Sequence, residues 1–172
     1  MKTYIGIDIG KNGAICSHTQ NGAINVWKIP MIKDQIDYAF LFDMIQNIQT
    51  TELSHTGSNP VVVFEKLGVI FGSSKATAFS MGYQSGAIEM ICIALGLPYS
   101  KISAKEWQKE MFKGVDEITK PGKSSRDTKA MALVAIKRLF PSLNLIFEGG
   151  KKPHDGLIDA VLISEYARRQ NI

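Results

Sequence analysis

The segment that most constrains the fold is residues 3–9, where β-branched and aromatic side chains surround a single carboxylate, Asp8. Tyr4, Ile5 and Ile7 predict a strand that is buried on both faces. A charge in such a strand is costly unless a cation or hydrogen-bond donors hold it. Asp8 is therefore a candidate metal ligand, or an aspartate beside a glycine turn that binds phosphate. The alternative without a function is an edge strand with Asp8 facing solvent.

Turn signals and hydrophobic periodicity divide the rest of the chain into strands and helices. The turn at residues 10–13 and the Asn21-Gly22 pair predict a three-strand antiparallel meander over residues 3–9, 14–18 and 23–29. Two later strands are predicted at 61–65 and 99–103. Capping boxes at Ser103 with Glu106 and at Ser124 with Asp127 predict the starts of two helices. The predicted helices are 34–49, before a polar loop at 54–60, then 75–95, 104–112, one that ends at Pro141, and 154–169.

This order predicts an α/β fold, in which an antiparallel meander and parallel strands form a mixed five-stranded sheet flanked by helices. The chain has 172 residues, 45% of them hydrophobic, and no repeat or linker, so we expect a single domain over residues 1–172. No apolar run approaches the roughly 20 residues that span a bilayer, and no signal-peptide pattern is seen. We expect a cytoplasmic protein without membrane contact. Cys16 and Cys92 lie in apolar segments and are expected to be reduced core residues.

The formal net charge of +4 is unevenly distributed. Residues 101–138 contain 10 Lys and Arg and 5 Asp and Glu, a net charge of +5, whereas residues 1–100 have −1 and residues 139–172 have 0. A positive excess confined to one stretch is expected of a face that binds a polyanion. A solvated helical surface would produce the same pattern.

Four acids on three predicted elements form a candidate metal site. Asp8 lies on the first strand, Glu65 ends the strand 61–65, and Asp155 and Asp159 share one face of the last helix. Carboxylates gathered at one point repel one another unless divalent cations bind them. Oxygen ligands favour Mg²⁺ or Mn²⁺ over zinc. Taken singly, each acid could instead be a strand end, a helix N-terminal acid or a surface residue.

Several segments resemble one known family when taken in order: GIDIG around Asp8, VVVFEK around Glu65, SKATAFSMGYQSGAIEMICIALGLP, ISAKEWQKEMFKG and HDGLIDAVLISEYAR. Over nearly its whole length the chain resembles the RuvC family of Holliday junction resolvases, of the RNase H-like superfamily, and the phage-encoded members in particular. The resemblance implies an RNase H-like fold and a homodimeric endonuclease for DNA recombination and repair. Such an enzyme would nick two opposed strands of four-way DNA junctions in the bacterial host cytoplasm.

The resemblance also implies that Asp8, Glu65, Asp155 and Asp159 hold two Mg²⁺ ions, for which Mn²⁺ can substitute, and that no nucleotide cofactor is needed. Bacterial members space the last two ligands three residues apart, whereas Asp155 and Asp159 are four apart. The family spacing would put residue 156, a glycine here, at the third position. His154 is a further candidate for a metal or phosphate contact, although a histidine at a helix start can also be incidental.

Other residues are candidates for DNA binding and dimer formation. Phe71 is a candidate wedge between unstacked bases, or else a core residue. The helix 75–95 is expected to form the dimer through Ala78, Met81, Gly82, Ser85 and Ile88, residues that could equally pack on the sheet. Gly6 and Gly10 are expected to leave room for a DNA backbone beside Asp8. Phosphate contacts are expected from basic residues of the segment 101–138: Lys109, Lys123, Arg126 and Lys129.

Three alternative functions remain compatible with these residues. A related RNase H-like nuclease acting on forks, flaps or RNA would use the same acids. A non-catalytic junction-binding module would bind branched DNA without metal-dependent nicks. A sugar-kinase-like or actin-like ATPase also begins with a D-x-G strand, but it needs a second domain and a second phosphate loop, which 172 residues can hardly supply.

Overall fold

The computed structural model describes residues 2–66 and 74–172. Within them, the main sheet consists of β1 (Thr3–Asp8), β2 (Ala14–Thr19), β3 (Ile24–Lys28), β6 (Val61–Glu65) and β7 (Tyr99–Ile102). The spatial order is β3-β2-β1-β6-β7, so β1 is central. The first three strands are antiparallel, whereas β6 runs parallel to β1 and β7 parallel to β6. The predicted mixed five-stranded sheet with its antiparallel meander is confirmed, and Asp8 is not on an edge strand.

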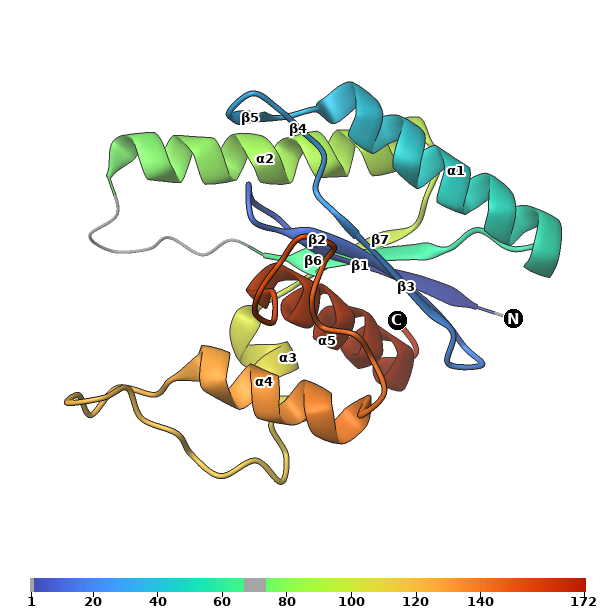
Figure 1. Ribbon diagram of the computed structural model, residues 1–172. Helices are drawn as coiled ribbons and strands as arrows, with labels where there is room; N and C mark the ends of the chain where they lie inside the picture. The colour runs from blue at the N-terminus through green and yellow to red at the C-terminus, as the bar shows by residue number, and fades with distance from the viewer. Residues whose placement is uncertain (1, 67–73) are drawn as a thin grey trace.

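Helices cover both faces of this sheet (Figure 1). On one face lie α1 (Tyr38–Thr56) and α2 (Lys75–Ala94), and on the other lie α3 (Ala104–Met111), α4 (Thr128–Leu139) and α5 (Asp155–Gln170). The predicted α/β class is therefore confirmed. Within residues 2–66 and 74–172, no helix is both long and apolar enough to cross a membrane.

Side chains of the central strand β1 alternate between the two faces, as strand geometry requires. Ile5 and Ile7 belong to the hydrophobic cluster under α1 and α2. Tyr4 belongs to the cluster under α3, α4 and α5, and the same alternation places Gly6 and Asp8 on that face. Cys16 and Cys92 are buried free thiols, as predicted.

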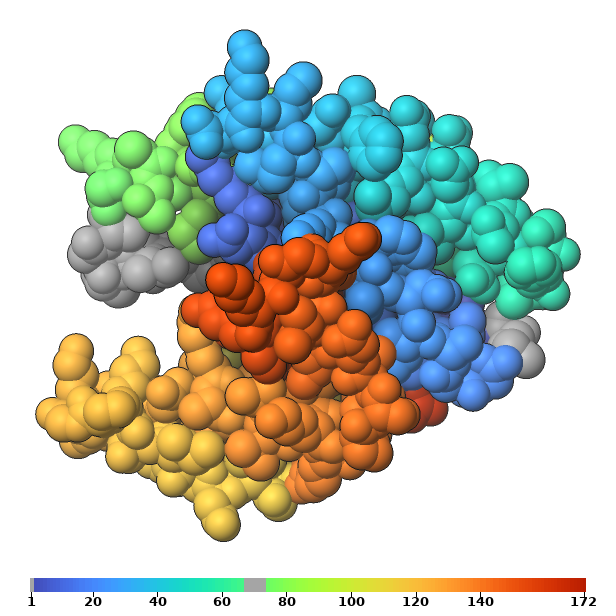
Figure 2. Space-filling model, viewed as in Figure 1, coloured from blue at the N-terminus to red at the C-terminus, as the bar shows by residue number. Residues whose placement is uncertain are grey.

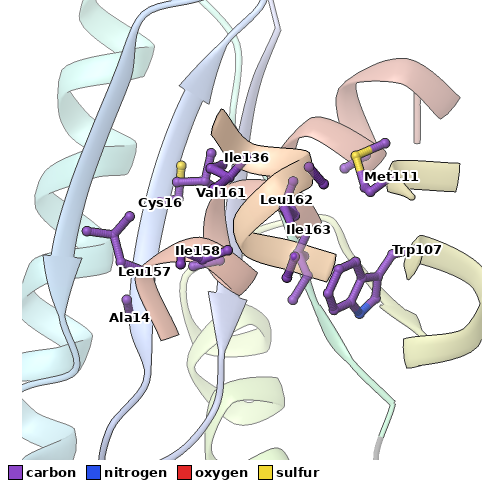
Figure 3. Packing of buried hydrophobic residues seen from close by; sticks show 14 of the residues in the cluster. Ala14, Cys16, Trp107, Met111, Ile136, Leu157, Ile158, Val161, Leu162 and Ile163 are labelled. Carbon is purple, nitrogen blue, oxygen red and sulfur yellow. The ribbon is translucent and has the colours of Figure 1, made fainter. Parts of the chain in front are cut away.

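Helix α5 lies directly on β1. A Cβ atom at Gly6 would come within 2.3 Å of the Ala160 carbonyl oxygen and 2.7 Å of the Ser164 backbone nitrogen, so only glycine permits this contact. The expectation that Gly6 leaves room for DNA is wrong, because α5 fills that space. Figure 3 shows the other side of α5, where Leu162 and Ile163 point toward Trp107 and Met111.

The segment between β3 and β6 differs from the prediction. A short hairpin of β4 (Met31–Ile32) and β5 (Gln35–Ile36) stands where the first turn of the helix 34–49 was expected. Helix α1 begins only after its N-cap Asp37, which accepts a hydrogen bond from the Phe40 backbone nitrogen. It then continues through the first part of the predicted loop 54–60 and ends at Gly57 in the left-handed conformation.

The two predicted capping boxes have different outcomes. Ser103 and Glu106 form a capping box at the start of α3, with each side chain accepting from the other residue's backbone nitrogen. The box predicted for Ser124 and Asp127 is wrong. Asp127 is itself the N-cap of α4 and accepts from the Ala130 backbone nitrogen.

Candidate active site

Asp8 and Glu65 end two neighbouring parallel strands. Ile7 of β1 is paired with Phe64 of β6, and Asp8 and Glu65 each follow this pair by one residue. Ile7 and Phe64 belong to the cluster under α1 and α2, so the next residue on each strand faces α5. The parallel register thus brings two carboxylates to the same end and the same face of the sheet.

Helix α5 adds two further acids, Asp159 and, one turn earlier, Asp155 in its first turn. This turn reaches the loop between β1 and β2 because residue 156 is glycine. A Cβ atom at Gly156 would lie 2.3 Å from the Asn12 carbonyl oxygen and 3.0 Å from Asp8 Oδ2. The position that the family spacing assigns to a ligand therefore has no room for a side chain.

The charges of the other acids influence two of these carboxyl groups, those of Asp8 and Asp159. Burial, together with the charges of Asp159, Glu65 and Asp155, raises the pKa of Asp8 to about 8. Burial and the charges of Glu65 and Asp155 likewise raise the pKa of Asp159 to about 7. Lys129 lowers both pKa values, by less. Asp8, Glu65, Asp155 and Asp159 are called the acid cluster below.

Two members of the acid cluster are engaged by other side chains. Trp107 Nε1 donates a hydrogen bond to Glu65 Oε1 at 2.8 Å. Lys129 Nζ lies 2.6 Å from Asp155 Oδ2 at the exposed rim. In this arrangement, no three His, Cys, Asp or Glu side chains of residues 2–66 and 74–172 form a ready cation site. Asp155 would have to leave Lys129 to share an ion with the others.

The chemistry of the acid cluster nevertheless suits a hard divalent cation. Its donors are all carboxylate oxygens, the ligands that Mg²⁺ and Mn²⁺ prefer. The raised pKa values of Asp8 and Asp159 report negative charge that is crowded and poorly solvated, with Lys129 as a partial counterion. A bound cation would relieve this repulsion. By the chemistry of their donors, though not in the arrangement of the described residues, these acids fit the metal that the resemblance implies.

His154 is the N-cap of α5. Its Nδ1 accepts a hydrogen bond from the Leu157 backbone nitrogen at 3.2 Å, and its ring packs edge-on against Phe147, with centroids 5.0 Å apart. Burial and the nearby charge of Lys28 lower the pKa of His154. The helix cap occupies Nδ1, so a metal or phosphate contact by His154 could use only Nε2.

The predicted DNA-binding residues lie on α3, on the loop before α4 and on α4. Lys123 is in the exposed loop, and Lys129 on α4 reaches the acid cluster. Figure 2 shows this loop in yellow, projecting beside a hollow in the molecular surface. A cavity of about 410 Å³ between α3 and the loop is lined mainly by basic side chains: Lys105, Lys109, Lys113 and Arg126. Phe71, the predicted wedge, lies outside the described residues.

Sequence reasoning placed Gly156 at the family's ligand position, but it predicted neither the close contact of Gly156 nor the hydrogen bond of Trp107. Trp107 lies on the apolar side of α3, where a tryptophan is expected to be a core residue, and nothing local indicates that its N–H reaches another strand. Gly156 at the second position of a helix carried a clearer signal, because glycine is disfavoured there unless another backbone approaches closely.

Comparison with solved structures matches the fold over nearly the whole chain. RuvC of Thermus thermophilus is 15% identical with a TM-score of 0.55, and the match covers 98% of this chain and 96% of RuvC. T. thermophilus RuvC in complex with a Holliday junction substrate is 13% identical with a TM-score of 0.50, at the same coverage. No protein-family model matches the chain, and no curated protein matches its sequence significantly.

The sheet order and the flanking helices place the chain in the RNase H-like class of α/β folds. Within that class, it has a RuvC-like fold. The resemblance to the RuvC family is thus confirmed at the level of the fold.

Proposed function

We propose that this chain, acting as one nuclease domain over residues 1–172, is a metal-dependent endonuclease that resolves four-way DNA junctions by paired nicks. The observation that carries the proposal is the acid cluster, in which strand ends Asp8 and Glu65 meet Asp155 and Asp159 of α5 within a RuvC-like fold. The solved complex of T. thermophilus RuvC with a Holliday junction substrate supports branched DNA as the ligand.

The acid cluster would hold two Mg²⁺ ions, with Mn²⁺ as a substitute. When bound, such ions lower the pKa of an attacking water and stabilise charge on the phosphate and on the leaving oxygen. Asp8, Glu65 and Asp159 would supply half-buried carboxylates, while Asp155 would supply an exposed one. No nucleotide cofactor is required by this chemistry.

Phosphate binding would come from the basic residues beside the cluster: Lys109, Lys123, Arg126 and Lys129. Lys129 differs from the other basic residues, because its ammonium group already forms an ion pair with Asp155 of the acid cluster. A DNA phosphate that binds Lys129 competes for that ammonium group and frees the Asp155 carboxylate. Arrival of DNA would thereby make the fourth acid available to a cation.

Paired nicks in opposed strands require two active sites, and we propose that a second copy of this chain provides the other. Four side chains along one side of α2 are 55–77% exposed, at successive spacings of four, seven and three residues: Phe79, Tyr83, Met90 and Ile93. This exposed side is the proposed dimer surface. Of the face predicted from sequence, Ile88 is buried against the sheet, whereas Ala78 and Gly82 are exposed, and that face stays a prediction.

The test is cleavage of a synthetic four-way junction by the wild-type protein, Asp8→Asn and the control Asp43→Asn, with and without Mg²⁺. Asp43 is an exposed acid on α1, outside the acid cluster. We expect symmetric Mg²⁺-dependent nicks from the wild type and the control, and none from Asp8→Asn, which should still bind the junction. Cleavage by Asp8→Asn at the wild-type rate would refute the proposal.

Parallel substrates separate the remaining alternatives. A preference for forks, flaps or an RNA strand over the four-way junction would identify a different nuclease of the same fold. Junction binding without cleavage in either Mg²⁺ or Mn²⁺ would identify a non-catalytic binding module.

A further inference from the structure

Trp107 connects the hydrophobic core to the acid cluster. Its side chain is 1% exposed and packs edge-on against Phe112, with ring centroids 6.0 Å apart. Figure 3 shows the indole beside Ile163 of α5. A buried indole N–H needs an acceptor, and Trp107 Nε1 donates to Glu65 Oε1 at 2.8 Å.

The fold brings Trp107 to Glu65 by a short path. Glu65 of β6 is paired with Ile102 of β7, and the backbone nitrogen of Lys66 donates to the Ile102 carbonyl oxygen at 2.6 Å. Helix α3 begins two residues after Ile102, and the capping box of Ser103 fixes its direction. Trp107, on the first turn of this capped helix, therefore lies next to the end of the strand that carries Glu65.

The hydrogen bond restrains a carboxylate that would otherwise rotate. The indole N–H is only a donor, and the packed ring cannot turn away from Glu65. Oε1 accepts from Trp107, and among residues 2–66 and 74–172 no side chain donates to Oε2, which can therefore face another ligand. Packing alone does not require this N–H, since a phenylalanine could fill most of the same space.

We propose that Trp107 is a positioning residue of the acid cluster, and that its indole N–H fixes Glu65 so that Oε2 is presented to a divalent cation. This inference rests on the proposed metal-dependent function. Residues that orient a metal ligand in this way typically contribute about 10-fold to 100-fold in metal affinity.

The experiment measures Mg²⁺ affinity without DNA, by isothermal titration calorimetry of the wild-type protein, Trp107→Phe, Glu65→Gln and the double variant. Trp107→Phe should weaken Mg²⁺ binding about 10-fold. The double variant should bind no more weakly than Glu65→Gln, to within about a factor of 2, because the indole acts only through Glu65. Ile136→Ala, which opens a cavity elsewhere in the same hydrophobic cluster, should leave Mg²⁺ affinity unchanged.

A second measurement keeps Trp107 intact. The chain has two tryptophans, so in a Trp27→Phe background Trp107 is the sole indole fluorophore. Mg²⁺ should shift its emission, and adding Glu65→Gln should abolish the shift. This measurement tests the coupling of Trp107 to a cation at Glu65 even if Trp107→Phe does not fold.

Four results would overturn the inference: wild-type Mg²⁺ affinity in Trp107→Phe, effects of Trp107→Phe and Glu65→Gln that simply multiply, equal weakening by Ile136→Ala, or a Trp107 emission that ignores Mg²⁺. A wild-type protein that binds no Mg²⁺ overturns both this inference and the metal-dependent function. Trp107-dependent Mg²⁺ binding without DNA cleavage overturns only the proposed function.

Discussion

Replacing Gly156 by alanine tests whether the close approach of α5 to the loop after β1 holds the acid cluster together. The new Cβ atom would lie 2.3 Å from the Asn12 carbonyl oxygen, 2.8 Å from Gly13 Cα and 3.0 Å from Asp8 Oδ2. Ordinary contacts begin at 3.4 Å, and two of these three atoms belong to the backbone. The start of α5 must therefore move away from β1 by about 1 Å.

The size of the effect follows from two opposing terms. Overpacking of this kind costs about 1–3 kcal/mol, whereas alanine is better than glycine in a helix by about 1 kcal/mol. The cost of overpacking is the larger of the two, because these backbone atoms cannot move aside as a flexible side chain could. For a chain of this length each kcal/mol lowers Tm by about 2–4 °C, so Gly156→Ala should lower Tm by a few degrees. A displacement of about 1 Å at the acids should lower the cleavage rate by about 10²-fold.

Thermal unfolding and Mg²⁺-dependent junction cleavage measure the two effects. Gly82→Ala in α2 is the matched control, because a Cβ atom there meets no atom within 4 Å. It should keep or raise Tm through helix propensity alone. If Gly156→Ala retained both the Tm and the cleavage rate of the wild type, the close contact would not position the acid cluster.

Three further outcomes are expected. Lys109→Gln should reduce the slope of log affinity for junction DNA against log salt by about 0.9, measured by fluorescence anisotropy, and an unchanged slope would contradict a phosphate contact. Burial lowers the pKa of His18 to about 4. Between about pH 6.5 and 4 the imidazole is therefore protonated in the unfolded chain but not in the folded chain. Stability should thus fall between pH 6.5 and 4, by up to about 3 kcal/mol in urea unfolding, and His18→Gln should remove that contribution. Tyr83→Glu should shift sedimentation from dimer to monomer, whereas Phe40→Glu on exposed α1 should not.

The sheet could be predicted because its strands and turns have clear local sequence signals. β1 and β6 are short apolar runs that each end in one acid, and Asn21-Gly22 marks a tight turn between two others. Such patterns depend on nearest neighbours along the chain, which is the information that a sequence displays directly.

The elements that were mispredicted depend on contacts or on competing signals. Ile36 continues the helical spacing of α1, yet it belongs to β5, and Asp37 caps the helix one residue later. Ser124 and Asp127 match the capping-box pattern, but the aspartate at its third position is itself a good N-cap. In both cases two local rules indicated different helix starts, and the helix begins after the aspartate N-cap.

The four-residue spacing of Asp155 and Asp159 has a physical explanation in the same glycine contact. Because Gly156 lies against the Asn12 backbone, position 156 has no room for a carboxylate, and the acid of the first turn is at residue 155 instead. At that position Asp155 has a side chain 56% exposed and meets Lys129, whereas Asp8, Glu65 and Asp159 stay half-buried. The acid cluster thus consists of three half-buried acids fixed by the sheet and α5, and a fourth at the exposed rim that is paired with Lys129.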